Sequence, residues 1–239
     1  METPDNQGKL YLIPSLMGDV EPLEVLPLAV KKVIDMTSHY IVENEKSARA
    51  FIKRVHPGKA QDRLDIQVLN KFTEREDIPG FLEPCLQGQN LGIISEAGAP
   101  GIADPGAEVI NLAYERQIRV VPLVGPSSIL LAMMASGMNG QNFAFNGYLP
   151  IDKSDRKREI QRLEKLSQKT GQSQIFIETP YRNHKLLDTL LKVCHPDTRL
   201  CVARELTLPS EYIRSARISW WRNNIPDLEK KPAIFIIQA

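Results

Sequence analysis

Cysteine is scarce in this chain, with three residues among 239. Cys85, Cys194 and Cys201 lie in or next to apolar segments, and their spacing fits neither a metal site nor a disulfide framework. The sequence therefore predicts free thiols in a reducing compartment, and we expect a cytoplasmic protein.

Long apolar runs and an excess of charge are also missing. No stretch approaches the roughly 20 apolar residues that a membrane span requires, and residues 1–8 are polar and contain no apolar signal core. The formal net charge is +1, which indicates no bulk attraction to nucleic acid or to an anionic membrane, although a local basic groove is compatible with it. These absences predict a soluble protein that does not bind membranes.

Several common catalytic motifs are absent as well. The sequence has no phosphate-binding P-loop, no GxGxxG after a predicted strand and no GxSxG nucleophile elbow. Its four histidines, His39, His56, His184 and His195, are scattered and form no HExxH, so no metal site is predicted. These absences argue against a dinucleotide-binding fold and against a methyltransferase of the usual Rossmann type.

The most informative segment that is present runs from Leu91 to Gly106. Its apolar start, Leu91–Ile94, predicts a buried strand, and Gly98, Gly101 and Gly106 predict a tightly turning loop before helical periodicity resumes. Open α/β sheets build ligand sites from this order of strand, loop and helix. The loop runs to about twelve residues, whereas an ordinary connection has two to six, so a functional loop is favoured over a structural one.

The whole chain reads as two α/β domains. In residues 1–150, short apolar strands alternate with amphipathic helices, which favours a mainly parallel sheet with helices on both faces. Residues 151–239 begin with a charged helix and continue with strands in succession, which favours a mixed or antiparallel sheet. We place the boundary at Pro150–Ser154 and expect a ligand in the cleft between the halves.

Two segments carry further structural expectations. Residues 127–138 are almost wholly apolar, and a helix that is apolar all round is expected to be buried, with its methionines packing in the core rather than forming a ligand site. Residues 211–221 are expected to form a strand that ends in Trp220 and Trp221, at an edge that suits a dimer interface better than base stacking.

Loops that follow predicted strands offer the groups from which a site could be built. They span residues 14–18, 96–100, 125–128, 178–182 and 203–207. These loops offer backbone N–H and C=O groups and hydroxyls, with little charge. That chemistry suits a neutral or zwitterionic ligand with an aromatic ring better than a triphosphate, which would require lysines.

Sequence blocks in these loops resemble one branch of the tetrapyrrole methylase superfamily. Residues 95–106 read SEAGAPGIADPG and are similar to the signature SDAGTPxIxDPG of the branch that contains the small-subunit ribosomal RNA cytidine 2′-O-methyltransferase. Residues 120–126, 147–150 and 177–182 are similar to its VVPLPGP, GFLP and YESPHR, and residues 202–207 match VARELT. The blocks keep the order of the family from Leu10 to Ile237, which is far more specific than any one of them.

The resemblance implies two α/β domains, a homodimer and S-adenosylmethionine bound in the interdomain cleft. Matched position by position, it assigns cofactor contacts in both halves of the chain. In the first half, and at the start of the next helix, these are Pro14, Gly18, Gly98, Ala99, Pro100, Ile102, Ser127 and Ser128. In the second half they are Leu149, Tyr181, Leu206 and Ala233.

Methyl transfer to a hydroxyl acceptor benefits from a general base as well as from positioning of donor and acceptor. Among the strand-end glutamates, which include Glu43 and Glu205, we favour Glu96 or Glu178, because each lies beside a site loop. An equally weighted alternative is that these glutamates bind backbone N–H groups and hold the loops. Arg182 and Arg204 suit phosphate contacts to an RNA acceptor, or structural ion pairs, which we favour slightly.

The sequence also departs from the family pattern. Glu96 stands where the family has Asp, and Ala99 replaces a threonine. The family's EDTR is ENEK at residues 43–46, its KGE is KPA at residues 231–233, and nothing after Ala239 corresponds to the small C-terminal extension of the ribosomal enzyme. These changes affect the acceptor more than the cofactor.

We therefore predict an S-adenosylmethionine-dependent methyltransferase that acts on RNA, at a ribose 2′-oxygen of ribosomal RNA. A small, tetrapyrrole-like acceptor is the alternative that the short chain and the low net charge favour. A non-catalytic protein that binds S-adenosylmethionine is a further alternative, which the altered residues 43–46 permit.

Overall fold

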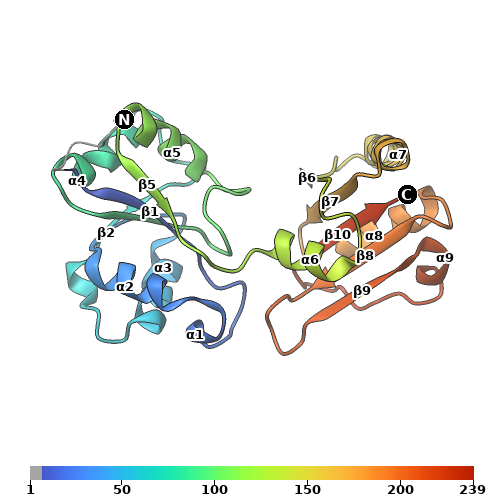
Figure 1. The fold of residues 1–239 in the computed structure, drawn as a ribbon, viewed down its shortest axis with the longest axis horizontal. Helices are drawn as coiled ribbons and strands as arrows, with labels where there is room; N and C mark the ends of the chain where they lie inside the picture. Colours follow the sequence, from blue (N-terminus) through green and yellow to red (C-terminus); the bar gives the residue numbers. More distant parts are fainter. Residues whose placement is uncertain (1–6) are drawn as a thin grey trace. The chain divides into compact units, whose positions relative to one another are not determined.

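The computed structural model describes residues 7–239, which form two compact α/β units that divide between Ser127 and Ser128 (Figure 1). Unit 1 comprises the chain up to Ser127, and unit 2 comprises Ser128–Ala239. Each unit is built around its own sheet.

Unit 1 contains a five-stranded sheet in the order β3-β2-β4-β1-β5, in which every pair is parallel. Its strands are β1 (Lys9–Ile13), β2 (His39–Val42), β3 (Asp65–Val68), β4 (Leu91–Ile94) and β5 (Arg119–Pro122). Its helices are α1 (Pro22–Val25), α2 (Leu28–Met36), α3 (Glu45–Val55), α4 (Glu83–Leu86) and α5 (Gly106–Glu115), with short 3₁₀ turns at Gln61–Arg63 and Ile78–Leu82.

Helices cover both faces of this sheet, as the sequence predicts. On one face, Ile13 of β1 packs in a cluster with residues of α2 and α3, such as Ile34 and Ile52. On the other face, Leu10 packs with residues of α4 and α5. Successive side chains of a strand point to opposite faces, so a strand that is apolar throughout is buried by helices on both sides.

The local sequence determines where helix α3, which borders the site, begins and which of its sides is buried. The Asn44 side chain accepts a hydrogen bond from the Ser47 N–H at 3.1 Å, which caps the N-terminus of the helix. Ala48, Phe51, Ile52 and Val55 are spaced by three or four residues and are buried against the sheet. Burying each of the larger side chains contributes about 1.5–3 kcal/mol.

Unit 2 contains a mixed sheet in the order β6-β7-β10-β8-β9, in which β6 and β7 are parallel and the other pairs are antiparallel. Its strands are β6 (Phe143–Tyr148), β7 (Ser173–Glu178), β8 (Arg199–Arg204), β9 (Tyr212–Arg217) and β10 (Ala233–Gln238). Its helices are α6 (Ser128–Ser136), α7 (Lys153–Thr170), α8 (Asn183–Val193) and α9 (Ile218–Trp221). The predicted mixed sheet is confirmed.

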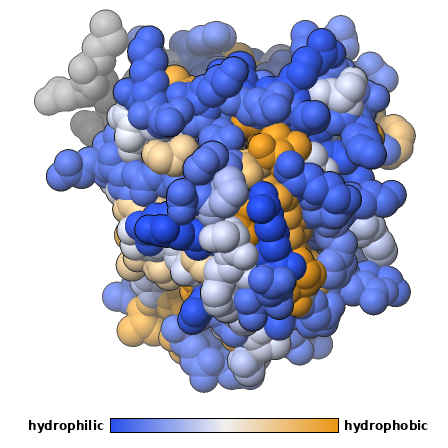
Figure 2. Space-filling model, turned by 90° about the vertical axis from the view of Figure 1, so that its right-hand side faces the viewer, coloured by the Kyte–Doolittle hydropathy of each residue, from blue (hydrophilic) through white to orange (hydrophobic). Residues whose placement is uncertain are grey.

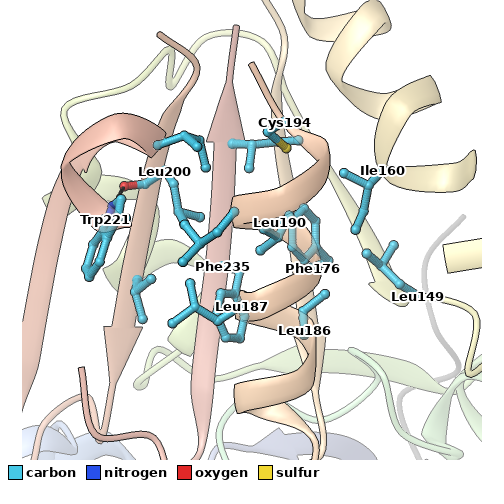
Figure 3. Packing of buried hydrophobic residues seen from close by; sticks show 14 of the residues in the cluster. Leu149, Ile160, Phe176, Leu186, Leu187, Leu190, Cys194, Leu200, Trp221 and Phe235 are labelled. Carbon is cyan, nitrogen blue, oxygen red and sulfur yellow. Dashed lines mark hydrogen bonds between the residues drawn. The ribbon is translucent and has the colours of Figure 1, made fainter. Parts of the chain in front are cut away.

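The core of unit 2 lies between this sheet and helices α7 and α8. Figure 3 shows Leu187 and Leu190 of α8 near Phe235 and Phe176, whose rings stack with centroids 6.2 Å apart. Helix α7 buries only Ile160 and Leu163 of its larger apolar residues, and its charged residues are mostly exposed. Like the exposed side of α7, the face of the molecule in Figure 2 is mostly hydrophilic, and it has a narrow hydrophobic strip.

The division between the units differs from the expected boundary at Pro150–Ser154. Residues 128–150 belong to unit 2 because β6 pairs with β7 and α6 contacts β8, β9 and β10. The change of composition at Pro150 marks the start of the charged helix α7 and not the start of the second unit.

Helix α6 differs from the expectation that it is buried on all sides. Ala132 and Met133 are buried, whereas Leu130 is 54% exposed and Met134 is 80% exposed. Within unit 2 the expectation is therefore wrong for one side of this helix, because no other segment of that unit covers these two side chains.

The segment 211–221 also differs from its expectation. Strand β9 ends at Arg217, and Ile218–Trp221 forms a short helix. Trp221 is fully buried in the core of unit 2, and its Nε1–H donates a hydrogen bond to the Leu200 carbonyl at 2.9 Å. The helix turns this side chain inward, away from the sheet edge on which it was expected.

No helix within residues 7–239 combines the length and the apolar character that crossing a membrane requires. The same residues contain no group of three or more histidine, cysteine, aspartate or glutamate side chains placed to hold a metal ion.

Candidate functional site

The carboxyl ends of the unit 1 strands form the first part of the candidate site. All five strands are parallel, so the loops that follow them leave the sheet at one edge. In open parallel sheets, this edge is where ligands bind. The loops after β1, β4 and β5, which are residues 14–21, 95–105 and 123–127, carry the unit 1 residues that the family resemblance assigns to the cofactor.

Direct contacts hold these three loops together. The Ser15 N–H donates to the Gly98 carbonyl at 2.9 Å, and the Ser95 hydroxyl donates to the same oxygen at 3.1 Å. A side chain at Gly125 would place its Cβ 2.2 Å from Cγ of Pro14, and one at Gly98 would lie 3.4 Å from the Pro126 carbonyl. Close contact therefore requires glycine at position 125, and the φ of 74° favours it at position 98. The structure brings together these parts of the predicted site.

The loop after β4 is shaped by Asp104. Its carboxylate accepts hydrogen bonds from the N–H groups of Gly101 and Gly106, at 2.8 Å each for Oδ1. Ala103 has a φ of 62°, which is unusual for a residue with a side chain. Beside it, the apolar Ile102 is 54% exposed at the tip of the loop. The loop thus presents an exposed apolar side chain on a backbone that Asp104 holds in place.

Four of the five predicted residues of unit 2 share one sheet edge, and the fifth, Ser128, begins α6. Ala233 at the start of β10 pairs with Glu178 at the end of β7 and with Arg204 at the end of β8. Leu149 directly follows β6, and the loops after β7 and β8 hold Tyr181 and Leu206. Tyr181 is 78% exposed, whereas Leu149, Leu206 and Ala233 are buried.

Glu178 and Glu96, the two glutamates proposed as bases, have different surroundings. The Glu178 side chain is 1% exposed, and its Oε1 lies 2.6 Å from Nη2 of Arg182 and 2.7 Å from the Thr179 N–H. Through these contacts, the Glu178 carboxylate fixes the loop that follows β7. Arg204 is likewise paired, with Glu205.

Glu96 is exposed at the unit 1 edge, and its Oε1 accepts a hydrogen bond from the Ser47 hydroxyl at 2.5 Å. Its backbone N–H donates to Oε1 of Glu43 at 3.1 Å. Burial raises the pKa of Glu43 above its ordinary value, the hydrogen bond from Glu96 opposes this, and the charges of Asp104 and Glu96 raise the pKa further. At the unit 1 edge, the carboxyl group with the raised pKa therefore lies next to Glu96.

A pocket of about 220 Å³ opens beside Glu96, between α3 and the loops after β1 and β4. Ser15, Ser47 and Arg54 are among the residues that line it. Ser15 lies in the predicted site loop 14–18, whereas Ser47 and Arg54 were not predicted, because they lie on α3 outside every predicted loop and reach the site only through the fold.

The cysteines are not part of the site. All three are buried and free. Burial raises the pKa of the Cys85 and Cys201 thiols to about 12 each, and it raises that of Cys194 well above its ordinary range. They are therefore protonated at neutral pH and do not serve as nucleophiles.

Solved structures with the same fold define a class of two-unit α/β methyltransferases. The methyltransferase CobJ aligns with a TM-score of 0.64 and 14% identity, covering 97% of this chain and 94% of that one. The cobalt precorrin-4 methyltransferase CbiF aligns with a TM-score of 0.61 and 15% identity, covering 96% and 94%. The uroporphyrin-III C-methyltransferase of Thermus thermophilus, complexed with S-adenosylhomocysteine, aligns with a TM-score of 0.57 and 16% identity over 97% of both chains.

Sequence comparison assigns the family. Residues 10–219 match the family model described as Tetrapyrrole (Corrin/Porphyrin) Methylases, so the chain belongs to this family. The Ribosomal RNA small subunit methyltransferase I of Vibrio cholerae is 28% identical over 215 residues, which cover 88% of this chain and 69% of that protein. The Bacillus subtilis protein of that name is 30% identical over 222 residues, which cover 91% and 71%.

The chain is therefore an S-adenosylmethionine-dependent methyltransferase. The unit 1 loops fit this cofactor. Residues 14–18, 95–105 and 123–127 contain no lysine or arginine, and their charged residues are Glu96 and Asp104. A sulfonium cation is stabilised by such surroundings, whereas a triphosphate is not. When bound, the cofactor supplies an electrophilic methyl group on sulfur.

Proposed function

We propose that this methyltransferase modifies RNA, at a ribose 2′-oxygen of the small-subunit ribosomal RNA. The observation that carries the proposal is the extent of the similarity to proteins named Ribosomal RNA small subunit methyltransferase I, at 28–30% identity over 87–91% of the chain. The family model matches residues 10–219, which include the loops that converge at the unit 1 edge. The tetrapyrrole enzymes are 14–16% identical and support the fold only.

The donor contacts are part of the same proposal. In unit 1 we assign them to Pro14, Gly18, the loop residues 98–100, Ile102 and Ser127. Ser128, at the start of α6, and the edge residues Leu149, Tyr181, Leu206 and Ala233 are assigned in unit 2. The convergence of the unit 1 loops and the shared edge of the unit 2 residues support these assignments.

In the proposed reaction, Glu96 acts as the base. The acceptor hydroxyl oxygen attacks the methyl carbon, a carbon–oxygen bond forms, and the carbon–sulfur bond breaks with its electron pair going to sulfur. The Glu96 carboxylate takes the hydroxyl proton and later releases it to water. Glu96 is favoured over Glu178 because its side chain is exposed, whereas that of Glu178 is buried against Arg182.

Two measurements test the function. Calorimetric titration with S-adenosylhomocysteine should show binding at a single site. Transfer of tritiated methyl groups to undermethylated small-subunit ribosomal RNA should then exceed transfer to the fully methylated RNA. Transfer to a corrinoid precursor instead would reassign the acceptor, and binding without transfer to either acceptor would indicate a non-catalytic protein.

We also infer that the protein is a homodimer that acts in the cytoplasm. Exposed Leu130 and Met134 on α6 support a partner copy, because apolar side chains that lie together on a surface mark interaction sites. The three buried thiols and a ribosomal acceptor support a reducing, cytoplasmic location.

A further inference from the structure

The pocket beside α3 includes one assigned donor contact, Gly18, and no other residue that lines it is assigned to the donor. It lies entirely within unit 1 and has a volume of about 220 Å³. Its apolar lining comes from Leu16, Phe51 and Ile94. Its polar lining includes Ser47, Arg54 and Glu96. Apolar walls with a few placed polar groups are typical of small-molecule sites.

Ser15 is an unsatisfied polar group in this pocket. It is 4% exposed, and its hydroxyl has no hydrogen-bond partner within residues 7–239. Its backbone N–H is already used by the Gly98 carbonyl. Because buried hydroxyls nearly always have partners, an unpartnered one that lines a pocket indicates a ligand that completes it.

Arg54 and Glu96 are the charged residues that line the pocket, and α3 carries further cations near Arg54. Nη1 of Arg54 lies 3.0 Å from Oδ1 of Asp19, whose side chain is 96% exposed, and Nη2 donates to the Val20 carbonyl at 2.7 Å. An ion pair this exposed is weak, and the guanidinium keeps further N–H donors. Lys46 and Lys53 are exposed on α3, and within the described part of the chain neither forms a salt bridge. Their spacing from Ala50, which lines the pocket, places all three on one side of the helix.

We propose that this pocket binds one nucleotide of the RNA acceptor, an inference that rests on the proposed function. The apolar lining receives the nucleoside, the Ser15 hydroxyl hydrogen-bonds to it, and Arg54, Lys46 and Lys53 contact the flanking phosphates. These cations attract phosphates, which the RNA acceptor carries and the donor lacks, so they favour the acceptor at this rim. Ser15 directly follows Pro14, which places the acceptor next to the assigned donor contacts.

Two pocket variants and one matched control test the proposal. Ser15→Ala removes the unpaired hydroxyl and Arg54→Met removes a rim cation. Lys32→Met removes an exposed cation of α2 that does not line the pocket. For each protein, the affinity for a fluorescent oligoribonucleotide from small-subunit ribosomal RNA is measured by anisotropy at several salt concentrations, with S-adenosylhomocysteine present. Calorimetry gives the affinity for S-adenosylhomocysteine itself.

We expect Ser15→Ala to weaken RNA binding about three- to tenfold. Arg54→Met should weaken it and lower the slope of log affinity against log salt by about one. Lys32→Met should match the wild type, and the affinity for S-adenosylhomocysteine should be the same in all four proteins.

Each other outcome has a defined meaning. A loss of S-adenosylhomocysteine affinity in either pocket variant would show that the cofactor binds in the pocket, and this would overturn the proposal. Unchanged RNA affinity in both pocket variants, or a wild type that binds no RNA, would also overturn it. If the wild type methylates ribosomal RNA and the pocket variants bind RNA as the wild type does, the pocket is not the acceptor site but the proposed function is supported. If the pocket variants lose RNA binding as predicted but no protein transfers a methyl group, the pocket is an RNA site and the proposed function is refuted.

Discussion

Single residues at the two sheet edges differ in what they contact, and this separates the candidates for the base. Glu96 is exposed and is held by the Ser47 hydroxyl, so an acceptor can reach it. We expect Glu96→Gln to lower kcat by about 10²–10⁴-fold, because the variant cannot take a proton. Binding of S-adenosylhomocysteine should be unchanged by calorimetry. Turnover equal to that of the wild type would remove Glu96 from the base role.

Glu178 provides the contrast, because its carboxylate is buried against Arg182 and the Thr179 N–H. Glu178→Gln weakens charge-assisted hydrogen bonds, so the free energy of unfolding should fall by about 1–3 kcal/mol. Urea denaturation measures this loss, and turnover per folded molecule should stay near that of the wild type. A loss of turnover without a loss of stability would instead assign the base role to Glu178.

Glu43 makes stability depend on pH. Burial raises its pKa in the folded state, so its folded form binds a proton more strongly than its unfolded form does. Its stabilising contribution is therefore present below its ordinary pKa and is lost as the pH rises through the raised folded value. Relative to the wild type, Glu43→Gln should melt at a higher temperature at pH 7 and at the same temperature near pH 4. Equal melting temperatures at both values would contradict the raised pKa.

At the scale of the secondary-structure elements, the contact between the loops after β1 and β5 depends on Gly125. A methyl group there would lie 2.2 Å from Cγ of Pro14, so Gly125→Ala must displace a loop that we assign to the donor. We expect it to lower the free energy of unfolding by about 1–3 kcal/mol and to weaken S-adenosylhomocysteine binding. Gly80→Ala is the control in the same unit, because a methyl group at Gly80 meets nothing within 4 Å. Equal effects of the two variants would refute the packing argument.

The strands and most helices could be predicted from the sequence because their apolar periodicity is strong. Pro27 divides the helical segment that follows β1 into α1 and α2, because it lacks an N–H donor and crowds the preceding turn. The helix at residues 218–221 could not be predicted, because it depends on the packing of Trp221 in the core of unit 2. The glycine-rich loops were visible in the sequence, whereas the pocket of Ser15, Ser47 and Arg54 was not. Its residues come from segments that only the parallel sheet brings together.

For the molecule as a whole, periodicity could not reveal where the units divide or which faces stay uncovered. Helix α6 is apolar in sequence, and its place in unit 2 follows from contacts with β8, β9 and β10. Those contacts bury Ala132 and Met133 and leave Leu130 and Met134 exposed. An apolar sequence thus predicts that a helix is covered, without saying whether its own chain or a second copy covers it.

The exposed side of α6 leads to a prediction about assembly. If a second copy covers Leu130 and Met134, light scattering should give twice the mass of one 26.9 kDa chain. Met134→Glu should shift the protein toward the monomer, because burying an unpaired carboxylate in an apolar interface is strongly unfavourable. Met36→Glu is the matched control, since Met36 is also exposed, at 51%, but lies on α2. A monomeric wild type, or the same mass for both variants, would show that α6 is not the dimer contact.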